Sequence, residues 1–110
     1  MTTVNNFGRN SGDKIRFKSD YVNAHVVLAN IEEKEAIPTQ FNTVVINATA
    51  PIYIKMGDSS VTAAVPTDVT NGSASELNPN AYAIYKEDTH ISVISPSNCI
   101  VTFAYYYIRY

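Results

Sequence analysis

The feature that most constrains the fold of this chain is a series of short runs in which apolar residues recur at every second position. Turn sequences separate these runs about every ten residues. In residues 51–56, Ile52, Ile54 and Met56 fall on one side of an extended backbone, which predicts a strand with one buried side. Further runs rich in β-branched or aromatic residues occupy residues 42–47, 90–94 and 100–108. We therefore expect an all-β protein: a single antiparallel β-sandwich, jelly-roll-like, with no fewer than about six strands and under about 10% helix.

The acidic stretch at residues 29–36 has two possible interpretations, a strand or a short helix. We interpret residues 24–29 as the end of a strand, followed by a charged turn and a short edge strand before Pro38. A short helix is the alternative, although it would gather three acidic side chains on one exposed surface. Ile31 and Ile37 also bracket the stretch without a helical apolar stripe between them.

Residues 65–79 carry the strongest turn signals of the chain. Asn71-Gly72 suits a turn with positive φ, and the two prolines, Pro66 and Pro79, cannot donate hydrogen bonds within a sheet. We expect ordered turn structure here rather than a regular strand. Asn78 precedes a proline, which favours an extended backbone at that residue.

Size and composition exclude several classes of protein. The chain has 110 residues, which suits one domain, and its formal net charge of −2 argues against nucleic-acid binding through bulk positive charge. No apolar run approaches the ~20 residues that span a bilayer, so no membrane contact is expected. The single cysteine, Cys99, rules out an internal disulfide.

The N-terminal residues differ in character from the rest. The first twenty residues hold four basic and two acidic side chains, for +2, while the other ninety hold four basic and eight acidic, for −4. Residues 2–13 lack apolar periodicity, so we expect residues 1–14 to form a flexible arm and residues 15–110 the β-sandwich domain. Residues 15–18 alternate, so Ile15 and Phe17 could form a short first strand. The arm supplies four of the candidate interface residues: Phe7, Arg9, Lys14 and Arg16.

No group of residues in the chain predicts catalysis. His25 falls inside an expected strand, and His90 lies near Asp88, but a histidine bonded to its neighbour at a strand end explains this pair. Cys99 is expected to be buried as a small apolar residue. Three His and Cys residues spread along the chain do not form a zinc site, and no phosphate-binding loop is present. We expect no enzyme, no cofactor, no metal and no small-molecule substrate.

Tyrosine is unusually abundant, with eight residues of which four lie among the last six. In an extended strand Phe103, Tyr105 and Tyr107 face one way, and Tyr106, Ile108 and Tyr110 face the other. One side can enter the core, while the other shows amphipathic rings that suit a protein interface. Tyr106 and Tyr110 are therefore candidate interface residues, unless both sides are covered within the domain.

Two stretches together resemble the small β-sandwich virion proteins of tailed bacteriophages. Residues 44–63 run as an apolar strand, a small polar turn and then Ile-Tyr-Ile-Lys-Met-Gly-Asp; residues 70–79 lead on to Thr89–Thr102. The resemblance covers about residues 41–104 and consists of strand and turn patterns, with no catalytic signature.

The resemblance implies a structural role in a phage particle, made in the cytoplasm of the bacterial host. Among such roles we favour a capsid decoration protein that contacts the major capsid protein and copies of itself, with a trimer favoured. A head–tail connector or tail component is an alternative, as is a module that binds carbohydrate or a host surface. Low charge and abundant Asn, Ser and Thr suit a protein that is held in a lattice.

Overall fold

The computed structural model describes residues 18–109. The predicted arm of residues 1–14 and the possible strand at residues 15–17 lie outside the described residues. The same holds for the candidate interface residues Phe7, Arg9, Lys14, Arg16 and Tyr110.

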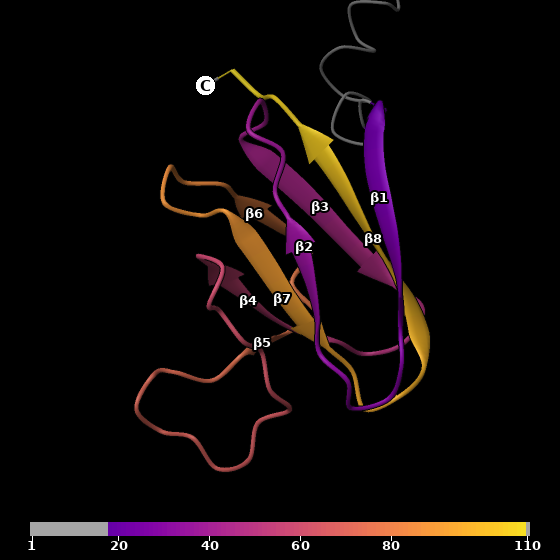
Figure 1. The fold of residues 1–110 in the computed structure, drawn as a ribbon, viewed down its shortest axis with the longest axis vertical. Coiled ribbons are helices and arrows are strands. Elements are labelled where there is room, and N and C mark those ends of the chain that lie inside the picture. The colour runs from indigo at the N-terminus through magenta and orange to yellow at the C-terminus, as the bar shows by residue number, and fades with distance from the viewer. Residues whose placement is uncertain (1–17, 110) are drawn as a thin grey trace, which may run out of the picture.

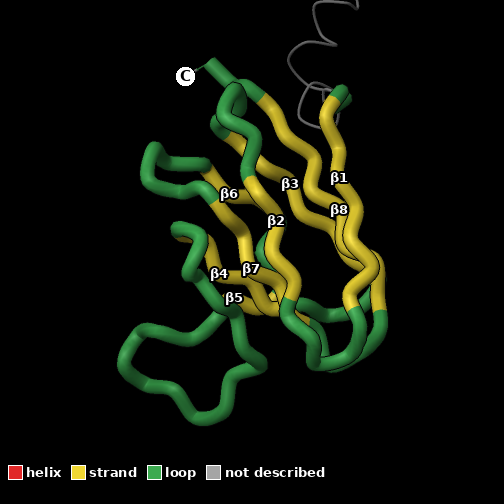
Figure 2. Tube along the Cα trace, in the orientation of Figure 1, coloured by secondary structure: helices red, strands yellow, loops and turns green. Residues whose placement is uncertain are grey.

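Eight strands and no helix make up the regular structure of the described residues (Figures 1 and 2). In chain order they are β1 (Tyr21–Val27), β2 (Glu33–Ala36), β3 (Thr43–Ala48), β4 (Tyr53–Gly57), β5 (Glu76–Leu77), β6 (Ala81–Ala83), β7 (His90–Ile94) and β8 (Cys99–Tyr106). They form two antiparallel four-stranded sheets that pack together as a sandwich. The all-β prediction is confirmed.

The order of the strands is that of a jelly roll. One sheet runs β1-β8-β3-β6 and the other β2-β7-β4-β5. The first strand thus pairs with the last, the second with the seventh, the third with the sixth and the fourth with the fifth. This is a long hairpin that has rolled up so that β8 also pairs with β3, and β7 with β4.

The core lies between the two sheets. It is built from the residues of each sheet that face the other sheet, normally every second residue along a strand. β8 contributes Val101, Phe103 and Tyr105, while β7 contributes Ile91 and Val93. The remaining members are Val27, Val44, Ile46, Ile52, Ile54 and Cys99. The predicted buried side of residues 51–56 is confirmed for Ile52 and Ile54, and Cys99 is buried as expected. Met56 is only partly buried, because it packs against the margin of this core.

The acidic stretch forms an edge strand and no helix. β2 lies at the edge of its sheet and pairs only with β7, as predicted for a short strand before Pro38. The preceding strand ends earlier than expected, at Val27. Asn30 then takes a left-handed φ of 63° in the turn between the two strands.

The connection between β4 and β5 is the long loop drawn away from the sandwich in Figures 1 and 2. Gly72 has the predicted positive φ, at 89°, and within residues 65–79 only the two residues of β5 form regular strand. The extended backbone expected at Asn78 is wrong, since its φ is 49°. Asn78 donates its N–H to the Ile52 carbonyl and accepts the Ile52 N–H through Oδ1, and these two bonds hold it in the left-handed region that asparagine tolerates.

Candidate interaction surface

Among the described residues, the strands of the sheet β1-β8-β3-β6 place no charged side chain on its outer face. The pairing register puts four rows on this face: Val22, Ala24 and Val26 of β1; Ile100, Thr102, Ala104 and Tyr106 of β8; Thr43, Val45 and Asn47 of β3; Ala81 and Ala83 of β6. Most of these side chains are aliphatic. An antiparallel sheet with one face in water normally presents polar residues on that face. We call this surface the neutral face.

Strand β1 is inverted relative to its own sequence pattern. Val22 and Val26 point away from the core and are 51% and 67% exposed, whereas Asn23 and His25 point toward the opposite sheet. Burial of an apolar side chain is favourable and burial of an uncompensated polar one is not, so this orientation needs a polar partner inside. That partner is Glu35 of β2.

Glu35 is a buried carboxylate that joins the two sheets. Its side chain is only 4% exposed, and its oxygens accept hydrogen bonds from three inward side chains. His25 Nε2 lies 2.6 Å from Oε1, while Asn23 Nδ2 and the Tyr105 hydroxyl each donate to Oε2 at 2.7 Å. Because a carboxylate only accepts, His25 presents a protonated Nε2 to it. This cluster was not predicted from the sequence, although the alternation of polar and apolar residues in β1 was a signal for it.

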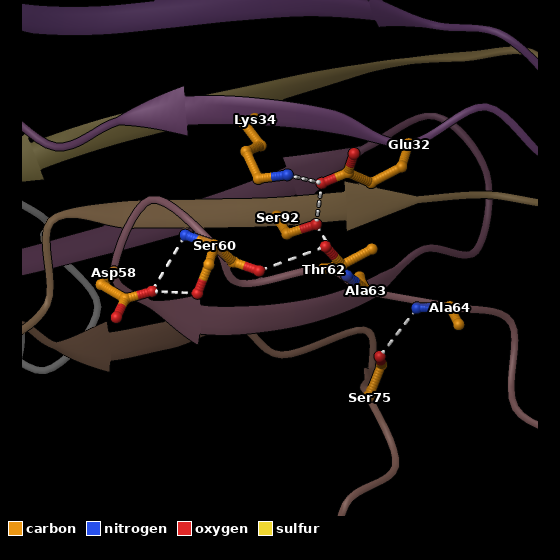
Figure 3. Close-up of polar contacts among 9 residues, drawn as sticks. All are labelled: Glu32, Lys34, Asp58, Ser60, Thr62, Ala63, Ala64, Ser75 and Ser92. Atoms are coloured by element: carbon orange, nitrogen blue, oxygen red, sulfur yellow. Dashed lines mark hydrogen bonds and ion pairs between the residues drawn. The ribbon is translucent and has the colours of Figure 1, made fainter.

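The outer face of the other sheet is different, because it is charged and partly covered. It carries Lys34, Lys55 and His90, and residues 61–64 cross it near Ser92. Ser92 is fully buried on this outward side: its hydroxyl accepts the Ala63 N–H at 2.7 Å and donates to Glu32 (Figure 3).

Two further contacts in Figure 3 hold the start of the long loop. Lys34 lies 3.0 Å from Glu32. Burial would raise the pKa of Glu32, but the hydrogen bonds from Ser92 and Lys34 outweigh it and hold that pKa below its usual value. Asp58 accepts from the N–H and hydroxyl of Ser60, which lowers the pKa of Asp58. These contacts tie residues 58–64 and Glu32 to this face, where Lys34 has an acidic partner.

Tyr106 is the predicted interface residue that the structure describes. It is half-buried on the outward side of β8 and lines, with Lys18, Val22 and Ala104, a hollow of about 510 Å³ at one end of the neutral face. The predicted alternation stops there, because β8 ends at Tyr106. Tyr107, expected on the same side as Tyr105, is 64% exposed, whereas Tyr105 is buried.

The candidate chemical groups of the sequence lie apart. The two histidines have separate partners: His90 bonds its neighbour Thr89 at 2.9 Å, as expected for a strand end, while Asp88 accepts the Tyr85 N–H. Within residues 18–109, no three His, Cys, Asp or Glu side chains gather as a metal site would require. The same residues include no helix long and apolar enough to cross a membrane.

Two hydrogen-bonded tyrosine hydroxyls, of the buried Tyr105 and the half-buried Tyr82, predict that the fold weakens in alkali. Burial, with a hydrogen bond to a glutamate, raises the pKa of Tyr105 and of Tyr82 above the ordinary value of 10.0. The unfolded chain then loses these protons at a lower pH than the folded chain. Stability is therefore retained below about pH 10 and falls as pH rises beyond it.

Urea midpoints measured from pH 8 to pH 11 test this expectation. We expect Tyr105→Phe and Tyr82→Phe each to flatten the alkaline fall, and Tyr85→Phe, at an exposed tyrosine, to leave it unchanged. A fall of equal slope in all three variants would contradict the assignment.

Comparison with known proteins adds no relative to these observations: the chain matches no protein-family model, no curated protein and no solved structure. The fold, the neutral face and the residues around it are thus what bears on function.

Proposed function

We propose that this chain is a non-enzymatic structural protein of a tailed-phage virion, which decorates the capsid by contacting copies of itself and the major capsid protein. It would be made in the host cytoplasm and be retained in the particle. The observation that carries the proposal is the neutral face: an exposed, aliphatic sheet surface without a charged side chain. Depletion of charge is the compositional mark of the centre of a protein interface.

The fold supports the proposal only as analogy. Jelly rolls occur in viral capsid proteins and also in lectins, so the architecture by itself does not select a role. The two outer faces differ in what they offer a partner. The charged face is crossed by residues 61–64 and its Lys34 pairs with Glu32, which leaves the neutral face as the surface that gains most from being covered.

A carbohydrate-binding module is the second candidate, favoured by one feature. Tyr85 is 65% exposed beside a hollow of about 260 Å³ that Phe41, Lys86 and Asp88 also line. An exposed ring next to charged groups is a surface on which a sugar can stack and form hydrogen bonds. Binding of the purified chain on a glycan array, lost in Tyr85→Ala, would favour this function over the first.

Composition analysis of particles tests the proposed role. We expect the chain in stoichiometric copies in gradient-purified phage particles by mass spectrometry, and as ordered density on the capsid by cryo-electron microscopy. Deleting residues 2–12 should reduce incorporation markedly, and raised salt should reproduce part of that loss, because this end carries the basic excess.

The same deletion has a control in the isolated chain. The deleted residues contain few apolar side chains, so the melting temperature should change by less than about 3 °C. A chain absent from purified particles contradicts the virion role. A deletion that leaves incorporation unchanged contradicts the role of the arm.

A further inference from the structure

We propose that the neutral face packs against the same face of a second copy, related by a two-fold axis that lies in the contact and runs parallel to the strands. This deepens the proposed structural role and rests on it for its biological meaning. The contact itself is a property of the isolated chain and is argued from the side chains on the sheet.

Charge is the first reason for a second copy. In a two-fold contact the same patch occurs on both partners, so any charge near its centre meets a like charge. The outward residues of all four strands are uncharged, and Lys18, which lines the hollow beside Val22 and Tyr106, is paired with Asp20 where β1 begins. Like charges therefore do not meet at the centre of the contact.

Shape is the second reason. The prominent side chains, Val22, Val26 and Ile100, stand on β1 and β8, whereas the far edge strand β6 presents only Ala81 and Ala83. A two-fold axis parallel to the strands places β1 of one copy over β6 of the other, and β8 over β3. In this register Val22 of one copy lies over Ala81 of the other, and Val45 over Ala104, so a branched side chain meets an alanine in each pair and the sheets can approach to the usual ~10 Å.

The available area sets the expected strength. Four strands ~4.8 Å apart, with an average length of about six residues at ~3.3 Å per residue, give a face of roughly 20 by 20 Å, smaller along the three-residue β6. Two such faces cover a projected area of about 800 Å², below the ~1,200 Å² at which standard stable interfaces begin. We therefore expect a reversible, concentration-dependent dimer, which a lattice would reinforce through repetition.

Sedimentation of the full chain over concentrations from about 5 to about 500 µM tests the pairing. We expect the mass to rise from 12.1 kDa toward twice that value. Val22→Glu should weaken the dimer at least tenfold, because the contact would bury an unpaired carboxylate. Leu77→Glu is the matched control, since Leu77 is 52% exposed on β5 of the other sheet, against 51% for Val22, and it should change the dissociation constant less than twofold.

Cross-linking tests the orientation independently. A mixture of Val22→Cys and Ala81→Cys chains should give a covalent dimer with a short bismaleimide, while either variant alone should give far less. Cys99, being buried, serves as a common background in both.

Each other outcome overturns the inference. A chain that stays monomeric, a mass three times that of the chain, or equal losses in Val22→Glu and Leu77→Glu would exclude this contact. Loss of the dimer on deletion of residues 2–12, with Val22→Glu unaffected, would assign it to the arm instead. Absence of the chain from phage particles would refute the virion role but would not affect a dimer measured in solution. The two experiments therefore test the virion role and the dimer contact separately.

Discussion

Replacing Glu35 with alanine should lower the free energy of unfolding by roughly 2–4 kcal/mol, because buried donors would lose their shared acceptor. The Tyr105 hydroxyl and the Asn23 amide both donate to Oε2, and His25 contacts Oε1. The Tyr105 side chain is almost fully buried, so water cannot readily replace the carboxylate there. The His25 side chain is 24% exposed and can recover a bond with water, which limits the expected loss. Urea unfolding at pH 7 measures the effect.

The matched control removes a carboxylate of the same kind from an exposed turn. Glu87→Ala should change the stability by less than about 0.5 kcal/mol. Tyr105→Phe keeps the ring and removes one donor, and should cost about 1 kcal/mol. Because Glu35 and Tyr105 share a bond, the double variant should lose less than the sum of the two single losses. Additive losses, or a Glu35→Ala loss no larger than that of Glu87→Ala, would show that the cluster does not join the sheets.

The elements that the sequence predicted well are those in which one local pattern decides the outcome. Residues 51–56 alternate so that one side is aliphatic, and that side is buried at Ile52 and Ile54. Asn71-Gly72 places a glycine where φ is positive, and the structure uses it there. Strand and turn chemistry of this kind acts between near neighbours in the chain, so it can be predicted without knowing the fold.

The features that could not be predicted depend on partners distant in sequence. A two-residue repeat defines two sides of a strand, but not which side meets the other sheet. In β1 the aliphatic side faces outward because His25 and Asn23 bond Glu35, ten and twelve residues further along the chain. Asn78 departs from the preference imposed by the following proline because the backbone of Ile52 supplies two hydrogen bonds. The neutral face could not be predicted for the same reason, because it forms only when four strands distant in sequence pair in register.

The second large effect is expected at Ile54, in the centre of the core. Ile54 is 1% exposed and lies on β4, where it is in register with Val93 of β7 and faces the opposite sheet. Ile54→Ala removes buried methyl and methylene groups and leaves a cavity, which should cost about 2–5 kcal/mol. Lys55→Ala, the next residue on the opposite side of the same strand, should cost far less.

Comparing the stability losses of Ile54→Ala and Val26→Ala tests whether burial in the structure, rather than position in an alternating sequence, determines the cost of truncation. Both residues are branched aliphatics within alternating strands, and periodicity alone would place both in the core. The structure puts Val26 on the neutral face with 67% of its surface exposed, so in the monomer its truncation should cost less than about 0.5 kcal/mol. Unfolding measured at low micromolar concentration keeps the dimer from contributing. If both variants lose equal stability, β1 is not inverted, and the neutral face would then be polar rather than aliphatic along that strand.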